Sequence, residues 1–295
     1  MTDFRVVLLG AGAVGILPAV KLLEHPEISL LAAADKERVD RCRRHGIFFN
    51  DRLLPLEFAC PGEMTGLPPA DLIIVATKTT GLPAALDNII PVTGKNTIFL
   101  PLLNGISAAD EIAARFPENI TLKGFFLGHA SVRENNRIYH DGVGKFYIGG
   151  EKTAVNTVEN LFNSCGIEVE IPQDIDHAIW KKFILNVGIN QTQALFKADY
   201  GMVQKSPELL DFCRNLMREA VFVAEAENIS GTSGMIDEAI KVITSMPPDV
   251  KTSMLQDVLA GRATEVMAFA GVICEKAAKY GIPTPFNQQV LCGLV

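Results

Sequence analysis

Residues 4–15 read Phe4-Arg5-Val6-Val7-Leu8-Leu9-Gly10-Ala11-Gly12-Ala13-Val14-Gly15, and a helical pattern follows through Leu23. The first six residues are mostly apolar and partly β-branched, which predicts a buried β-strand. The glycines predict a tight turn from this strand into the helix, because glycine adopts backbone conformations that other residues avoid. The stretch therefore predicts the first strand–turn–helix unit of an open α/β sheet.

The glycines follow the spacing G-x-G-x-x-G, which serves dinucleotide binding when a strand precedes it and a helix follows. Gly10 permits the turn, Gly12 lets the backbone approach a pyrophosphate, and Gly15 lets helix and strand pack closely. A second predicted strand, residues 28–35, supports this interpretation. The alternative is that the glycines serve only the turn. The predicted cofactor loop consists of Gly10, Ala11, Gly12, Ala13, Val14 and Gly15.

Residues 71–78 are an apolar run that predicts a central parallel strand buried on both faces, and residues 96–105 predict another strand that ends in a turn. Ligands bind at the carboxyl ends of such strands, so Lys78 and Asn104 are candidate cofactor contacts. A solvated strand-end lysine and an ordinary turn asparagine are the alternatives. A helix is expected from about Ser107 to Phe116. Shorter strands are expected at 120–133, 144–149 and 167–171, with a helix at 153–165.

From Asp174 onward, helical patterns replace the alternation of strands and helices. Helices are predicted at about 174–198, 206–229, 232–245, 249–257 and 260–280, separated by Gly and Pro signals. We therefore predict two domains, a dinucleotide-binding domain over residues 1–172 and a helical substrate domain over residues 173–295. In two-domain enzymes of this layout, the active site is expected in the cleft between the domains.

The helical half contains a row of polar residues on an otherwise apolar helix. Lys182, Asn186 and Asn190 are spaced by four and so lie on one helix face. An ammonium can donate to a substrate oxygen and protonate it, and carboxamides can orient polar groups without adding charge. The row is therefore a candidate wall of a small-molecule site; a solvated stripe of an amphipathic helix is the alternative.

A second polar pair is Ser253 and Glu265. Either Thr252 or Ser253 is a plausible N-cap for the helix that begins there, and helical character is expected to resume at Arg262. Without other information, capping explains Ser253 and a surface or salt-bridged helix position explains Glu265.

Composition limits the remaining function classes. With 295 residues, 48% hydrophobic and 21% charged, the chain is typical of a globular protein with room for two cores. A formal net charge of -7 without a long basic run argues against nucleic acid and membrane surfaces as partners. The sequence has no uninterrupted span of about eighteen apolar residues, so no transmembrane helix is predicted. The six cysteines form no metal-ligand spacing or disulfide framework, which indicates reduced thiols, no metal site and a cytoplasmic protein.

Together these motifs resemble the ketopantoate reductase (2-dehydropantoate 2-reductase) family, and the resemblance covers essentially the whole chain. It implies a Rossmann-type α/β domain followed by an all-α domain resembling that of 6-phosphogluconate dehydrogenase. The implied reaction is reduction of 2-dehydropantoate to (R)-pantoate on the route to pantothenate and coenzyme A. By the resemblance, Lys182 is the general acid and Glu265 is an active-site acid. The implied substrate-binding residues are Asn104, Lys182, Asn186, Asn190 and Ser253.

The end of the second strand departs from the family pattern. The family commonly places an arginine there for the 2'-phosphate of NADPH, whereas this chain has Asp35. An acid at this position usually accepts from the ribose 2'-hydroxyl of NAD and repels the phosphate of NADP. Lys36, Arg38 and the cluster Arg41–Arg44 follow and could reach the phosphate if Asp35 turns away. NADP is therefore the first expected cofactor and NAD the alternative, with Asp35 and Lys36 in the cofactor site.

Two other functions stay open from the sequence. A paralogous reductase would act on another branched 2-keto acid, because no motif shapes the far end of the substrate. A dinucleotide-binding protein without turnover would have little need for the polar row and Glu265. A homodimer through the helical domain is a hypothesis that no motif supports.

Overall fold

The computed structural model describes residues 4–128, 132–140 and 144–295. Part of the predicted segment 120–133, residues 129–131, lies outside the described residues. The chain forms two compact units. The first contains the residues up to Asn104 together with Ala108–Ile175, and the second contains Gly105–Ser107 together with Asp176–Val295.

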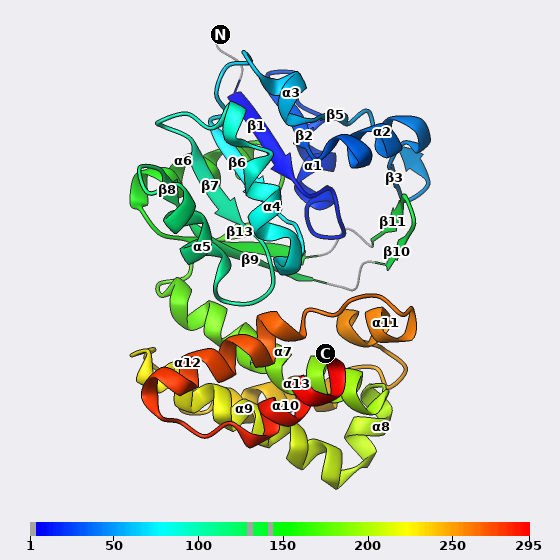
Figure 1. The fold of residues 1–295 in the computed structure, drawn as a ribbon, viewed down its shortest axis with the longest axis vertical. Helices are drawn as coiled ribbons and strands as arrows, with labels where there is room; N and C mark the ends of the chain where they lie inside the picture. The colour runs from blue at the N-terminus through cyan, green and yellow to red at the C-terminus, as the bar shows by residue number, and fades with distance from the viewer. Residues whose placement is uncertain (1–3, 129–131, 141–143) are drawn as a thin grey trace. The chain divides into compact units, whose positions relative to one another are not determined.

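The first unit is built on six parallel strands in the order β5-β2-β1-β6-β7-β8 (Figure 1). The order reverses between β1 and β6, as in doubly wound dinucleotide-binding sheets. This arrangement confirms the predicted α/β Rossmann-type fold. The strands are β1 Phe4–Leu9, β2 Ile28–Ala33, β5 Glu57–Ala59, β6 Leu72–Val75, β7 Ile98–Pro101 and β8 Ile120–Thr121.

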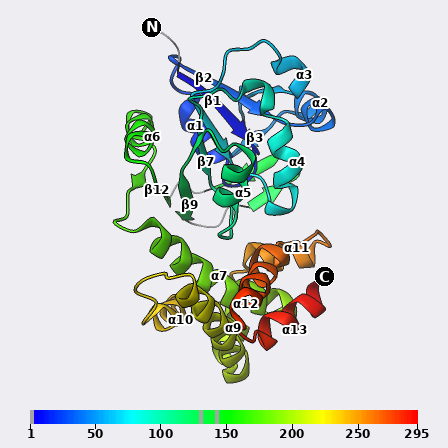
Figure 2. The ribbon, with the colours of Figure 1, turned by 60° about the vertical axis from the view of Figure 1, so that its left-hand side comes forward.

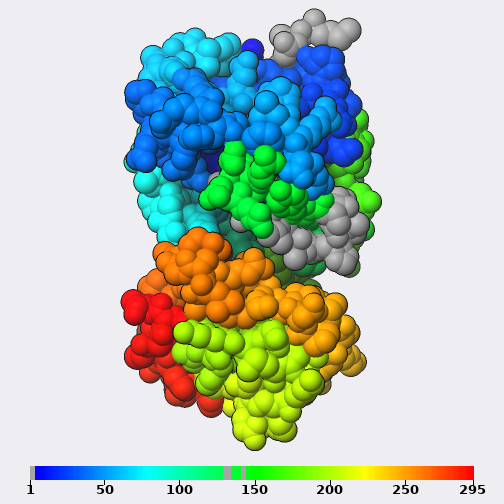
Figure 3. All heavy atoms as spheres, turned by 90° about the vertical axis from the view of Figure 1, so that its right-hand side faces the viewer, coloured from blue at the N-terminus to red at the C-terminus, as the bar shows by residue number. Residues whose placement is uncertain are grey.

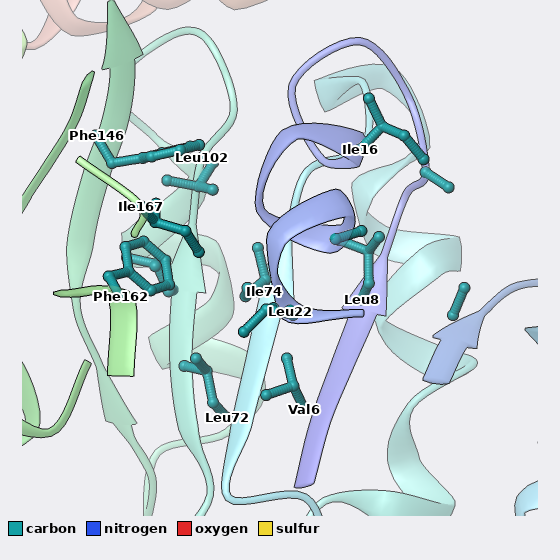
Figure 4. Packing of buried hydrophobic residues seen from close by; sticks show 14 of the residues in the cluster. Val6, Leu8, Ile16, Leu22, Leu72, Ile74, Leu102, Phe146, Phe162 and Ile167 are labelled. Atoms are coloured by element: carbon teal, nitrogen blue, oxygen red, sulfur yellow. The ribbon is translucent and has the colours of Figure 1, made fainter. Parts of the chain in front are cut away.

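Alternate residues of each central strand pack on opposite faces of the sheet, because successive side chains of a strand point to opposite sides. Val6 and Leu8 of β1 belong to the core that contains Ile16 and Leu22 of the first helix (Figure 4). Their neighbours on β1, Val7 and Leu9, belong to the core on the other face. The covering helices are α1 Ile16–Leu22, α2 Lys36–His45, α3 Pro61–Met64, α4 Leu82–Asp87, α5 Ala108–Arg115 and α6 Lys152–Ser164.

Two smaller sheets complete this unit. One is a three-stranded sheet in the order β13-β12-β9, made of β9 Lys123–Gly128, β12 Gly144–Gly149 and β13 Val169–Glu170. The other, in the order β10-β11-β3-β4, was not predicted. It pairs β3 Phe48–Phe49 and β4 Arg52–Leu53 with β10 Val132–Glu134 and β11 Arg137–Tyr139. Its strands have two or three residues each, too few for a period-two pattern to be recognised in the sequence.

The second unit is helical, and α7 is a long helix within it (Figure 2). Most residues of the C-terminal half of α7 are buried. Gly188 lets α7 pack closely on α9, since an added Cβ atom would lie 2.1 Å from Met217 and 2.9 Å from Cys213. Among the described residues, no helix combines the length and apolar character needed to cross a membrane. The helices are α7 Ile175–Phe196, α8 Tyr200–Lys205, α9 Pro207–Ala226, α10 Met235–Ser245, α11 Ser253–Leu259, α12 Val272–Tyr280 and α13 Pro285–Leu294.

Two of the predicted helix bounds were wrong. The helix predicted at 249–257 begins at Ser253, because Thr252 has an extended backbone and caps it. The helix predicted at 260–280 does not include residues 261–265: Gly261 has a φ of +64°, and the Arg262 N–H donates to the Asp257 carbonyl at 2.8 Å. Helical structure resumes with a π-helical turn at Met267–Gly271 that leads into α12. Glu265 therefore lies in a connector and not on a helix.

Candidate active site

The glycine loop follows β1 at the point where the strand order reverses. Gly10 has a φ of +103°, and a Cβ atom there would lie 2.7 Å from the Ala76 carbonyl group. At Gly15 a Cβ atom would lie 2.1 Å from the Gly10 oxygen. Both positions therefore require glycine for geometric reasons. No side chain caps the start of α1; the N–H groups of Ile16 and Leu17 donate instead to the carbonyls of Gly12 and Val14 at 3.0 and 3.2 Å, which closes the loop onto the helix. This loop fits a dinucleotide pyrophosphate.

Lys78 and Asn104 follow neighbouring strands at the same edge of this sheet. Lys78 comes three residues after β6, and Asn104 comes three residues after β7. These strands are paired in parallel, and β6 also pairs with β1, which leads into the glycine loop. The topology thus brings the predicted cofactor contacts to one edge, as expected from the sequence.

Asp35 ends the second strand region and serves as the N-cap of α2. Its Oδ1 accepts a hydrogen bond of 2.8 Å from the Arg38 N–H, and the side chain is exposed. Lys36 pairs with Asp40 instead, with Nζ 3.1 and 3.0 Å from the two carboxylate oxygens. The carboxylate is therefore fixed at the strand end, and the nearest lysine is engaged within α2.

The predicted polar row lies on α7, entirely within the helical unit. Lys182 and Asn186 are half-buried, and Asn190 is buried. The apolar residues between them are core residues: Phe183, Ile184, Val187 and Ile189 are all buried. The row is therefore a set of partly or fully buried polar groups, whereas a solvated stripe would be exposed throughout.

Lys182 and Glu265 interact electrostatically, although they are more than eighty residues apart in the sequence. Burial lowers the pKa of Lys182 to about 8, and the nearby Glu265 carboxylate acts in the opposite direction. Glu265 is half-buried, and its carbonyl accepts from the Ala268 N–H at 2.8 Å, which ties it to the π-helical turn that follows. An ammonium with this pKa can donate a proton near neutral pH.

Ser253 is the first residue of α11 and is exposed. The Thr252 hydroxyl accepts the capping bond from the Leu255 N–H at 3.4 Å, so capping does not explain Ser253. The Thr252 N–H donates to Oε1 of Gln193 on α7 at 2.9 Å, which ties the start of α11 to the helix of the polar row. Figure 3 shows the region of α11 in orange at the surface of the helical unit.

The sequence pattern did not predict Gln193 as a member of the polar row. It is fully buried, and it lies on the same face of α7 as the polar row. The available signal was its spacing of eleven from Lys182, which is close to three helical turns. A single glutamine among apolar residues carries no other motif.

Comparison with known proteins agrees with this architecture over both units. The family Ketopantoate reductase PanE/ApbA matches residues 6–152, and the family Ketopantoate reductase PanE/ApbA C terminal matches residues 174–294. A 2-dehydropantoate 2-reductase of Streptococcus pyogenes serotype M3 is 26% identical, and the match covers 97% of this chain and 95% of the relative.

Two solved structures share the fold. A dimeric ketopantoate reductase from Staphylococcus aureus has a TM-score of 0.83 at 22% identity, with 98% of this chain and 97% of that chain covered. A D-mandelate dehydrogenase in complex with NADH and anilino(oxo)acetate has a TM-score of 0.86 at 23% identity, with 97% and 96% covered. With both family matches in chain order, one on each unit, this chain belongs to the ketopantoate reductase family.

Proposed function

We propose that this protein reduces 2-dehydropantoate to (R)-pantoate with a nicotinamide dinucleotide, as a step in pantothenate and coenzyme A biosynthesis. When bound, the dinucleotide supplies a hydride to the keto carbon. The carbonyl π electrons then move to the oxygen, and the Lys182 ammonium gives that oxygen a proton. Lys182 is left neutral and is reprotonated from solvent before the next turnover. Atoms and charge balance without a metal ion.

The observation that carries the proposal is the state of Lys182. Burial lowers its pKa to about 8, so near pH 7 most of the side chain is protonated while its proton is released more readily than that of an exposed lysine. Glu265 counteracts the effect of burial and keeps the ammonium populated. A positioned general acid of this kind typically contributes a rate factor of roughly 10² to 10⁴.

The other residues would bind and orient the ligands. The glycine loop and the edge with Lys78 and Asn104 belong to the domain proposed to hold the dinucleotide, residues 1–172. Asn104, together with Asn186, Asn190 and Ser253, is proposed to bind the polar groups of the keto acid. All but Asn104 belong to the proposed substrate domain, residues 173–295. Their carboxamide and hydroxyl groups can donate to a carboxylate and a hydroxyl without adding charge.

The preference for NADPH over NADH should be weaker than in a typical NADPH enzyme. The Asp35 carboxylate at the end of β2 favours the ribose hydroxyls of NADH, and Lys36 would have to leave Asp40 to reach a 2'-phosphate. That pair is exposed to solvent and contributes little to stability, so it can open. We propose that NADP is used with at most a weak preference over NAD.

A second candidate is a reductase for another branched or bulky 2-keto acid that works with NADH. Asp35 favours it, because a fixed carboxylate at this position suits a ribose without phosphate. The D-mandelate dehydrogenase described above, whose structure contains NADH, has the same fold. A dinucleotide-binding protein without turnover is the third candidate, and the Lys182–Glu265 pair argues against it.

The test is a turnover assay that follows absorbance of NADPH or NADH with 2-dehydropantoate and a panel of other 2-keto acids. A specificity constant for 2-dehydropantoate at least about tenfold above every other acid supports the proposal. Preference for another acid supports the second candidate, and saturable dinucleotide binding without turnover supports the third.

We further propose a homodimer in the cytoplasm. Analytical ultracentrifugation at micromolar concentration tests the assembly, and a purely monomeric profile would contradict it.

A further inference from the structure

Gln193 extends the polar row of α7 by one position. With about 100° per residue, Lys182, Asn186, Asn190 and Gln193 fall within an arc of about 80° on the helix. Gln193 lies one turn after Asn190, and helical side chains lean toward the N-terminus of their helix. Its side chain therefore covers the turn that carries Asn190.

The two ends of the Gln193 carboxamide have different partners. Oε1 accepts from the Thr252 N–H at 2.9 Å, and only an acceptor can take this place, so the orientation of the amide is fixed. Nε2 is buried and has no hydrogen-bond acceptor among the described residues. A buried donor without a partner is destabilising, which makes such a group a strong candidate for a ligand contact.

Gln191, two residues earlier on the same helix, has no such free donor. Its Nε2 donates to the Val187 carbonyl at 2.9 Å and to Oδ1 of Asn287 at 3.0 Å. Its Oε1 accepts from the Ala270 N–H at 2.9 Å. Both glutamines are fully buried, yet only Gln193 retains an unused donor. Burial alone therefore does not account for the free amide of Gln193.

We propose that Nε2 of Gln193 donates to the polar group at the end of the keto acid remote from its carbonyl, and so selects substrates with a hydroxyl at that end. The inference rests on the proposed function, which places the keto oxygen at Lys182. The remote end of the substrate then lies toward Asn190 and Ser253. Gln193 bonds to Thr252, next to Ser253, and its side chain covers the turn that carries Asn190. Gln193 thus becomes a specificity-determining residue that the family motifs do not include.

The experiment combines a protein change with a substrate change. Gln193→Met keeps the length of the side chain and removes its hydrogen bonds. 3,3-Dimethyl-2-oxobutanoate differs from 2-dehydropantoate only by lacking the terminal hydroxyl. The ratio of kcat/KM for 2-dehydropantoate over the deoxy acid should fall by about fivefold or more in Gln193→Met, the effect of one neutral hydrogen bond. The loss should appear mainly in KM for the hydroxylated acid.

Gln191→Met is the matched control, because both ends of the Gln191 amide bond to protein groups and it has no unused donor. It should lower the thermal midpoint without changing the ratio. Gln193→Glu is the second variant: it keeps an acceptor for the Thr252 N–H, and when ionised it has no donor, so the ratio measured above the pKa of the new carboxyl should again fall. An unchanged ratio in either active Gln193 variant would overturn the inference while leaving the proposed function intact. Absence of keto-acid turnover by the unaltered protein would overturn both.

Discussion

The backbone N–H of Arg38 donates a 2.8 Å hydrogen bond to Oδ1 of Asp35, which caps α2 and fixes a carboxylate at the end of β2. This bond uses one carboxylate oxygen and leaves the exposed side chain free to accept from a ribose through the other. Asp35 therefore acts on stability and on cofactor choice at once, and the two roles can be separated by substitution.

Replacing Asp35 by Arg should raise the NADPH-to-NADH ratio of specificity constants by about tenfold or more, because a phosphate repulsion is replaced by a charge-assisted contact. Asp35→Asn is the control. It removes the charge but keeps the cap, so it should shift the ratio less and leave the thermal midpoint nearly unchanged. A wild-type ratio above about a thousand in favour of NADPH would show that Asp35 does not face the ribose.

The pH dependence of kcat/KM should show the pKa of Lys182. The protonated ammonium is the active form, so activity should be maintained below about pH 8 and should fall tenfold per pH unit above it. Glu265→Gln removes the charge that raises this pKa, so the fall should begin at lower pH. The profile is measured at saturating cofactor. An identical profile in Glu265→Gln would show that the Glu265 carboxylate does not affect the pKa of Lys182.

Lys182→Ala should lower turnover by about a hundredfold or more while cofactor binding stays within a few-fold, since the side chain is assigned to the developing charge on the substrate. Lys181→Ala is the matched control. Lys181 is exposed and pairs with Glu238 of α10, so its loss should leave turnover nearly unchanged. Steady-state kinetics and cofactor titration measure both effects. A larger effect of Lys181→Ala would mean that the wrong face of α7 was assigned.

Asn186→Ala and Ser253→Ala should each raise KM for the keto acid by roughly 10- to 150-fold, the loss expected for one hydrogen bond to a charged group. Cofactor affinity should stay unchanged, because both residues lie in the helical unit. Asn215→Ala, at a half-buried position on α9 where the carboxamide accepts from Arg218, serves as the control. Equal shifts in KM and cofactor affinity would argue against a substrate role.

Glu219 should be important for stability and not for chemistry. Its buried carboxylate accepts from the Phe286 N–H at 2.9 Å, from the Asn287 N–H at 3.0 Å and from the Asn287 side chain at 2.7 Å. It thereby holds the start of α13 against α9. Glu219→Ala should lower the free energy of unfolding by at least about 3 kcal/mol, since charged hydrogen bonds are lost and buried donors remain. Urea denaturation measures this; Glu208→Ala, at an exposed site on α9, should change the free energy of unfolding far less.

The sequence by itself determined the central strands of the parallel sheet and the polar row. The strand with Val6–Leu9, the glycines at 10 and 15 and the burial of a central strand on both faces all follow from local patterns, because strand and helix periodicities are properties of neighbouring residues. Lys182, Asn186 and Asn190 could be placed on one helix face for the same reason.

Only the tertiary structure decided which distant groups meet. The lowered pKa of Lys182 depends on its burial and on Glu265, which belongs to a segment wrongly predicted as helix. The free donor of Gln193 is visible only once Thr252 occupies the other end of the amide. Solvent exclusion and hydrogen bonds between remote segments carry no sequence period, so these properties arise only when the helices pack.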